Sequence, residues 1–289
     1  MKKRRFLACF LLVFVISFAF SVVASADTGP KPSVRITIQG LSEPAYATLL
    51  SERKSTGPHS AWDGSEEMAI HDSNTPYDIW EAFVTYEDAD GYYFLQQTEQ
   101  RVKANGECAW VYYPPERFKL LLYFPESDTF AVSAIYDRYA FHSYFTATVD
   151  EADASLSLVK SYDYMAETVG LLARIGITLL IELLLALFFF MKEKKLLLPI
   201  AVFNVATQIL LNLLLAWIGY KNGELAFMLR YIGCEILVTV IEVLLLCFLA
   251  PRLSQRPGVQ RRAILYAVLA NLSSLFLGLW ISLYLPGIF

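Results

Sequence analysis

Four long apolar segments in the second half of the sequence constrain its fold more than any other feature. At a rise of about 1.5 Å per residue, each segment is long enough to cross the roughly 30 Å hydrocarbon core of a bilayer. The composition agrees, because 56% of the residues are apolar and only 18% are charged. Residues 164–289 are therefore predicted to form a four-helix transmembrane bundle, with helices at about 168–191, 196–219, 225–250 and 263–285.

Basic residues in the connecting loops predict the orientation of this bundle. Lys192, Lys194 and Lys195 follow the first apolar segment, and four arginines separate the third segment from the fourth. Lys and Arg concentrate in cytoplasmic loops. We therefore expect a multi-pass protein of the bacterial cytoplasmic membrane with its N-terminal domain outside. The four arginines are Arg252, Arg256, Arg261 and Arg262.

The N-terminus has the pattern of an export signal. Four basic residues precede an apolar run from Phe6 to Phe20, and Ala24-Ser25-Ala26 supplies the small residues of a cleavage site. The sequence predicts a signal peptide over residues 1–26, with an uncleaved anchor as the alternative. Both interpretations place the domain that begins at residue 27 outside the cytoplasmic membrane.

Residues 27–163 differ from the apolar half, with twenty-two acidic and ten basic residues. Alternating apolar residues and aromatic or β-branched clusters predict a mainly-β, sandwich-like extracytoplasmic domain. Residues 51–74 are expected to form a long loop and residues 151–161 a polar tether. The expected strands lie near 34–38, 45–51, 92–97, 109–113, 118–124, 129–135 and 141–149, and the expected helix at 77–87.

No catalytic signature is present in this domain, so we predict a non-enzymatic protein without catalytic residues, cofactor or metal site. His59 and His71 share an acidic loop, but their spacing fits no standard metal site and a solvated loop explains it. Asp88 to Gly91 is similar to part of a calcium loop and equally to an ordinary turn. Aromatic residues suit either sugar or peptide stacking or, as we favour, the domain core. They include Trp62, Trp80, Trp110, Tyr112 and Tyr113.

Nine of the polar or charged residues in the predicted membrane helices are candidates for a shared interior face. Asn204, Gln208 and Asn212 recur at intervals of four, which places them on one helix face. From the rise per residue, we expect Glu182 near the depth of Gln208, and Glu242 near that of Asn204. The sequence therefore predicts an intramembrane polar seam. Its members are Glu182, Asn204, Gln208, Asn212, Glu235, Thr239, Glu242, Arg174 and Arg230.

Two interpretations of this seam stay open. Hydrogen bonds between amides and carboxyl groups join helices in a bilayer, and Asn271, Ser273 and Ser274 would let the fourth helix approach. Alternatively, the glutamates line a proton or cation pathway or bind a lipid headgroup, because ionisable residues in hydrocarbon are expensive and often functional.

Four short motifs carry a resemblance to a known group of proteins. They are Pro114–Phe118, Tyr123–Glu126, Asn204–Asn212 and Glu235–Glu242. With these motifs the chain resembles uncharacterised multi-pass membrane proteins of Gram-positive bacteria that carry an exported N-terminal β-domain. The resemblance implies this layout and no activity.

Together these patterns predict a sensing, binding or accessory component of a cell-envelope complex. The alternative is a transporter or channel subunit that uses the polar seam. Membrane lipid is the expected partner, with a protein partner or a second copy of the chain as further possibilities. Nucleic acid is not expected, because the net charge is −4.

Overall fold

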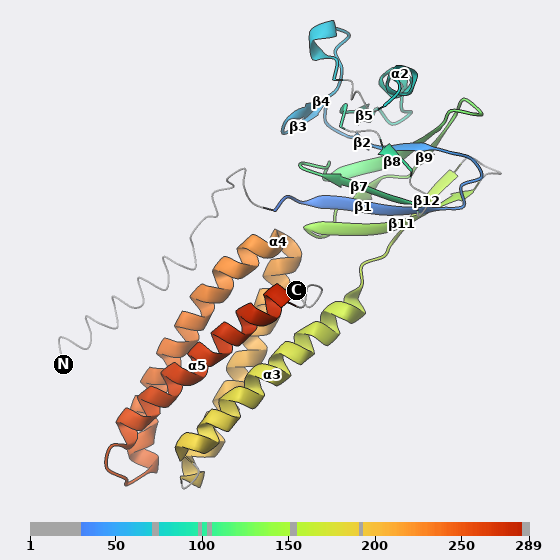
Figure 1. Ribbon diagram of the computed structural model, residues 1–289. Helices are drawn as coiled ribbons and strands as arrows, with labels where there is room; N and C mark the ends of the chain where they lie inside the picture. The colour runs from blue at the N-terminus through green and yellow to red at the C-terminus, as the bar shows by residue number, and fades with distance from the viewer. Residues whose placement is uncertain are drawn as a thin grey trace. The chain divides into compact units, whose positions relative to one another are not determined.

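The computed structural model describes residues 30–70, 75–97, 100–102, 106–150, 155–190 and 193–284. The chain divides into a mainly-β unit, Pro30–Tyr162, and a helical unit that begins at Asp163 (Figure 1). A mainly-β first half followed by long apolar helices is thus confirmed. The predicted signal peptide, His71 and Lys192 lie outside the described residues.

Ten strands of the described chain form one curved sheet, a half-barrel. Its main path runs β5-β2-β8-β9-β12-β11-β1-β7, with β10 beside β8 and β6 beside β2. A separate hairpin joins β3 (Ser55–Thr56) to β4 (His59–Ser60). The ten strands are β1 (Ser33–Gln39), β2 (Tyr46–Ser51), β5 (Tyr93–Phe94), β6 (Gln100–Arg101), β7 (Glu107–Val111), β8 (Arg117–Phe124), β9 (Thr129–Ser133), β10 (Tyr136–Asp137), β11 (His142–Asp150) and β12 (Ser155–Lys160).

Pairing between β9 and β12 distinguishes this sheet from the expected sandwich. Ser155 and Leu156 of β12 pair in parallel with Val132 and Ser133 of β9. This short contact joins two groups of strands, each with four strands on the main path, that a sandwich would keep as separate layers. β12 also corrects the predicted tether, because residues 155–160 form a strand whose Leu156 and Leu158 are buried.

β8 and β9 form the predicted hairpin, and β8 is buried on both faces. Phe118, Leu120 and Leu122 face the main core of the half-barrel, which also contains Trp110. Leu121 and Tyr123, on the opposite face of the strand, belong to a second core. The successive apolar residues of β8 therefore reflect two buried faces rather than one.

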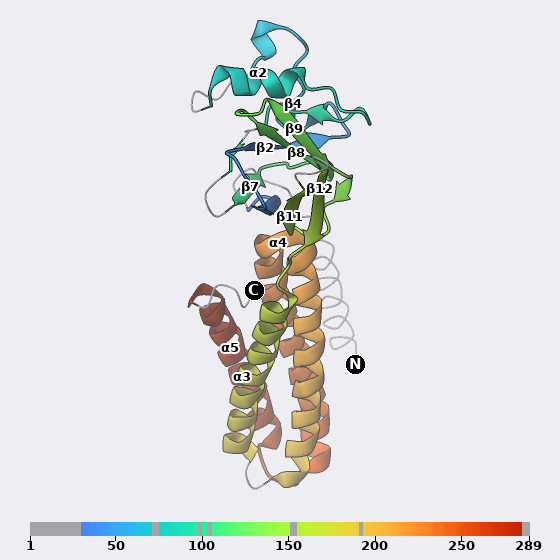
Figure 2. The same ribbon diagram turned by 90° about the vertical axis from the view of Figure 1, so that its right-hand side faces the viewer.

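Helix α2 (Tyr77–Thr85) covers the second core (Figure 2). Pro76 precedes it, and Ile79, Trp80 and Phe83 form its buried face, as the spacing i, i+1, i+4 requires. Trp80 and Trp110 are thus core residues. The loop expected at 51–74 contains the β3–β4 hairpin and a short 3₁₀ turn, η1 (Glu66–Met68).

The helical unit contains α3 (Tyr164–Phe190), α4 (Lys194–Leu253) and α5 (Val259–Tyr284). These three helices, among the described residues, are long and apolar enough to cross a membrane. α4 contains one non-helical residue, Gly223, at φ 82° and ψ 179°, a region open essentially to glycine alone. The chain reverses direction there, so that α4 is a helical hairpin (Figure 1). Its two limbs contain the predicted helices 196–219 and 225–250, and Leu215 of one limb packs with Tyr231 of the other.

Candidate functional site

Most of the predicted seam residues are buried in the helical unit, whereas many large apolar side chains are exposed on its surface. Seven of the nine predicted seam residues are less than 5% exposed, whereas Thr239 and Arg230 are only partly buried. Phe188, Leu198 and Leu210 are each at least 69% exposed. Folding in water produces the reverse distribution. The seven buried residues are Arg174, Glu182, Asn204, Gln208, Asn212, Glu235 and Glu242.

Gln208 is the centre of a hydrogen-bond network among α3, α4 and α5. Its Nε2 donates to Glu182 Oε1 at 2.8 Å and lies 3.4 Å from Ser274 Oγ. Its Oε1 accepts hydrogen bonds from Asn212 Nδ2 at 3.1 Å and from Thr178 Oγ1 at 3.3 Å. One amide thus links three helical segments, and the expected proximity of Glu182 and Gln208 is a direct contact.

Tyr266 of α5 is a second node, which the sequence analysis missed. Asn204 Nδ2 donates to the Tyr266 hydroxyl at 2.9 Å, and this hydroxyl donates to the Glu182 carbonyl oxygen at 3.4 Å. The ring packs edge-on against Phe190, with 5.5 Å between centroids. Tyr266 therefore joins the first limb of α4 to α3 through its hydroxyl, while its ring contributes to the apolar core.

The second limb of α4 also bonds to α5. Asn271 Nδ2 donates to Glu242 Oε2 and, at 2.9 Å, to the Ala267 carbonyl of its own helix. The Tyr231 hydroxyl donates to the Ser274 carbonyl at 3.4 Å. The hydroxyl of Thr239 bonds within its own helix. Asn204 and Glu242, which were expected at a similar depth, each form a hydrogen bond with a residue of α5. This helix therefore contributes more to the network than its composition suggests.

Three buried oxygen atoms of this network accept no hydrogen bond from the described residues. They are Asn212 Oδ1, Glu235 Oε2 and Glu242 Oε1. The Arg174 guanidinium lies 5.3 Å from the centre of the Phe227 ring, in a cation–π arrangement. No three His, Cys, Asp or Glu side chains within the described ranges are close enough to hold a metal ion.

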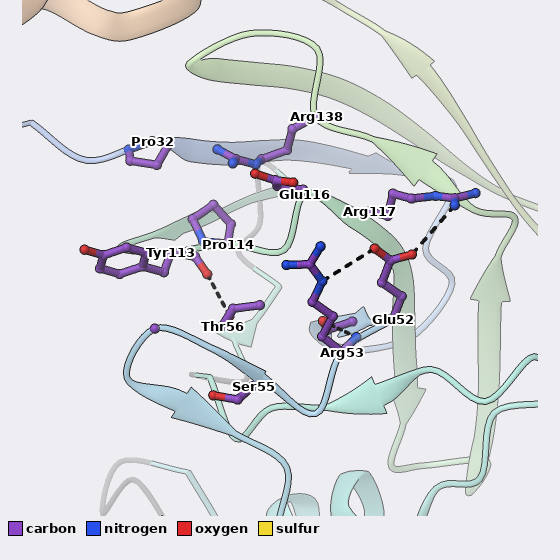
Figure 3. A pocket seen from close by; sticks show the side chains of 12 residues that line it. Pro32, Glu52, Arg53, Ser55, Thr56, Tyr113, Pro114, Glu116, Arg117 and Arg138 are labelled. Atoms are coloured by element: carbon purple, nitrogen blue, oxygen red, sulfur yellow. Dashed lines mark hydrogen bonds and ion pairs between the residues drawn. The ribbon is translucent and has the colours of Figure 1, made fainter. Parts of the chain in front are cut away.

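The β unit contains a cleft that sequence reasoning did not identify. Its volume is about 240 Å³, and it lies between the end of β2, the β3–β4 hairpin and the segment joining β7 to β8 (Figure 3). Glu52 lies between two arginines, with Oε1 4.0 Å from Arg53 Nε and Oε2 3.7 Å from Arg117 Nη1. Arg117 Nε also pairs with Asp137 at 3.3 Å. Residues of the Pro114–Phe118 motif line this cleft.

Two consecutive tyrosines form a strained wall beside the cleft. Tyr112 and Tyr113 have φ values of 70° and 64°, in the left-handed region that bulky residues avoid. Thr56 Oγ1 donates to the Tyr113 carbonyl at 3.1 Å, and His59 Nε2 lies 3.2 Å from the Tyr112 carbonyl. The Tyr113 ring also packs on Gly57, where an added Cβ would lie 2.9 Å from the ring. These contacts fix the wall before any ligand binds.

The other predicted candidates of this unit have structural partners. Burial lowers the pKa of His59, and the hydrogen bond to Tyr112 offsets part of this effect. Lys119 Nζ lies 2.8 Å from Asp88 Oδ1 and also pairs with Asp90. The two carboxylates that suggested a calcium loop thus neutralise a buried ammonium group.

No protein-family model matches the chain, and no curated protein is significantly similar to it. The helical network and the cleft are therefore interpreted from their own geometry.

Proposed function

We propose that the chain is an integral membrane protein in which four membrane spans anchor an extracytoplasmic β-rich binding domain. The spans are α3, the two limbs of α4, and α5. The proposal rests on the apolar surface and the buried polar residues of the helical unit. Exposed side chains such as Phe188 and Leu210 are stable against acyl chains and unfavourable in water. In this role the protein is a sensing or accessory component of a bacterial cell-envelope complex.

Contacts between the two basic loops support the orientation. Arg256 Nε pairs with Glu193 Oε1 at 2.9 Å, and Arg262 Nη1 donates to the Phe189 carbonyl at 3.5 Å. Both loops thus lie at the same end of the helical unit, and their positive charge favours the cytoplasm. At the other end of α3, the hydroxyls of Tyr164 and Tyr220 lie 3.2 Å apart, as in an interfacial aromatic belt.

We assign the polar network a structural role in this account. Lipid solvates separate apolar helices as well as packed ones, so the hydrogen bonds of the network help to hold the helices together. Each bond contributes roughly 0.6–2 kcal/mol. Amide groups are poor carriers of protons, because an amide nitrogen does not readily exchange roles between donor and acceptor. Gln208 and the three asparagines therefore suit helix assembly better than proton conduction.

The cleft supports a binding role for the β unit. It is concave, it combines charged with aromatic and proline residues, and its wall is held in place by hydrogen bonds from a neighbouring hairpin. Such pre-formed sites bind ligands with a small loss of conformational entropy. Lipid is the partner of the helical unit, and a protein partner or a second copy completes the proposed complex.

Thiol labelling in intact cells tests the topology. Val159 is 67% exposed in β12, and Lys195 is exposed near the start of α4. We expect a membrane-impermeant maleimide to label Val159→Cys in intact cells and Lys195→Cys only after permeabilisation. The parent chain is the control for its native cysteines, of which Cys108 is buried. Labelling of Lys195→Cys in intact cells, or release of the protein by carbonate washing, would refute the proposal.

A specific observation favours a second candidate, a transporter or channel subunit. The buried acceptors Asn212 Oδ1, Glu235 Oε2 and Glu242 Oε1 provide negative potential that a proton or a cation would satisfy. In proteoliposomes, this candidate requires an ion flux that is lost in Glu235→Gln and Glu242→Gln. Our leading proposal predicts no flux in the parent or in either variant.

A further inference from the structure

Arg138 is the one arginine of the cleft lining whose side chain has no ion pair within the described residues. The lining contains three arginines and two glutamates. Arg53 and Arg117 share Glu52, whereas Arg138 Nε is enclosed and has no hydrogen-bond partner in this part of the chain. Burial lowers the pKa of Arg138, and the charge of Glu116 offsets part of this effect. A partly buried guanidinium without an ion pair gains from an incoming carboxylate.

Glu116 is close enough to Arg138 to influence its charge and also lines the cleft. The two residues are tied through the backbone, because the Arg138 amide donates to the Glu116 carbonyl at 2.8 Å. In Figure 3, Arg138 and Glu116 lie on the same side of the cleft and Arg53 lies on the other side. A ligand with one negative charge would therefore meet repulsion from Glu116 unless it also carried a positive group.

The remaining lining and the volume limit the size of the ligand. Pro32, Pro114 and the Tyr113 ring provide an apolar side. A volume of about 240 Å³ lies below the roughly 300–1,000 Å³ of sites for drug-sized molecules. This volume restricts the ligand to a small molecule.

We propose that the cleft binds a small zwitterion, an amino acid or a short peptide, with its carboxylate on Arg138 and its ammonium group on Glu116. The apolar part of the ligand lies against Pro114 and Tyr113. This assignment rests on the proposed binding role of the β unit and adds its ligand class.

Calorimetric titration of the full chain in nanodiscs tests the assignment. The probes are alanine, alanyl-alanine, acetate, ethylamine and inorganic phosphate. We expect the two zwitterions to bind and the three other probes to bind at least about tenfold more weakly, because each charged hydrogen bond contributes about that factor. Equal or tighter binding of acetate or phosphate would overturn the zwitterion assignment.

Three variants identify the groups involved. Arg138→Lys keeps the charge without the planar fork and should weaken alanyl-alanine binding about ten- to a hundredfold at an unchanged melting temperature. Glu116→Gln should remove the preference for alanine over acetate. Arg35→Gln is the matched control, because Arg35 is an exposed arginine of β1 outside the lining, and it should bind as the parent does.

The two levels of the proposal fail in different ways. If the labelled topology holds and the folded protein binds none of the probes, the ligand class is wrong and the membrane-anchored role stands. If Val159→Cys is not labelled from outside, the proposed function is wrong, whatever the titrations give.

Discussion

Replacing Gln208 by leucine tests whether the polar network holds the helices together. The side chain donates to Glu182 at 2.8 Å and has longer contacts of 3.3 Å and 3.4 Å with Thr178 and Ser274. A bond to a carboxyl group contributes about 1.5 kcal/mol, and each longer contact about 0.5 kcal/mol. Gln208→Leu should therefore lower the free energy of unfolding by about 2–3 kcal/mol, although leucine is more soluble in lipid.

Reversible unfolding by sodium dodecyl sulfate in mixed micelles, followed by circular dichroism, measures this change. Leu210→Ala is the matched control, because Leu210 lies two residues away and is 69% exposed, so that this substitution should change stability by about 0.5 kcal/mol or less. In the double variant with Glu182→Leu, the losses should fall short of additivity by about 1.5 kcal/mol, since both remove the same bond. Unchanged or increased stability in Gln208→Leu would refute the structural role of the network.

Three further predictions concern single positions. Asn204→Leu should lower the unfolding free energy by about 1 kcal/mol, because it removes the 2.9 Å bond to Tyr266, as measured in the same unfolding assay. Gly223→Ala should lower it by about 1–3 kcal/mol, because alanine is strained at φ 82° and ψ 179°. Lys119→Met should destabilise the β unit by about 3–5 kcal/mol in thermal unfolding, because it leaves the buried Asp88 carboxylate without its partner.

Gly223→Ala has a matched control, and Lys119→Met has a pH dependence that can contradict it. Gly219→Ala controls for Gly223, since Gly219 is not among the left-handed glycines and a Cβ added there would meet the Phe227 ring at an ordinary 3.5 Å. Burial alone would lower the pKa of Lys119, but Asp88 and Asp90 outweigh it and raise the pKa. The stability that Lys119 provides should thus persist from neutral pH to about pH 10.4, the pKa of an unfolded lysine, and vanish as the pH rises through the folded value. If the difference in stability between the parent and Lys119→Met disappeared below about pH 9, the predicted direction of this pH dependence would be wrong.

Local periodicity predicts those elements of the fold that have a single clear pattern. Val34, Ile36 and Ile38 alternate along β1, and the β8–β9 hairpin has a turn sequence between two apolar runs. β12 has Leu156, Leu158 and the exposed Val159 as its apolar residues, beside two serines and a lysine, so its sequence is similar to a linker. Its position depends on its antiparallel pairing with β11, and the periodicity of one segment does not indicate its partner strand.

The two candidate sites differ in how far the sequence predicts them. Polar residues at intervals of four within apolar helices indicate a buried face, and the rise per residue places Glu182 and Gln208 at a similar depth, whereas their hydrogen bond is seen only in the structure. Tyr266 was missed because tyrosine is common at membrane interfaces and its depth is not diagnostic. The cleft was missed because Arg53 and Arg138 lie eighty-five positions apart and only the folded sheet brings them to one cavity.

An oxygen-accessibility scan along the first limb of α4 in a bilayer tests the inward orientation of the polar residues most directly. Nitroxide labels at single cysteines from residue 208 to 217 report collisions with lipid-soluble oxygen and with a water-soluble nickel complex. We predict oxygen maxima at Leu210, Leu213 and Trp217, which are 53–69% exposed, and minima at Leu211 and Leu215, which are at most 5% exposed. A profile without this helical period, or strong collisions of the nickel complex at Leu210, would contradict it.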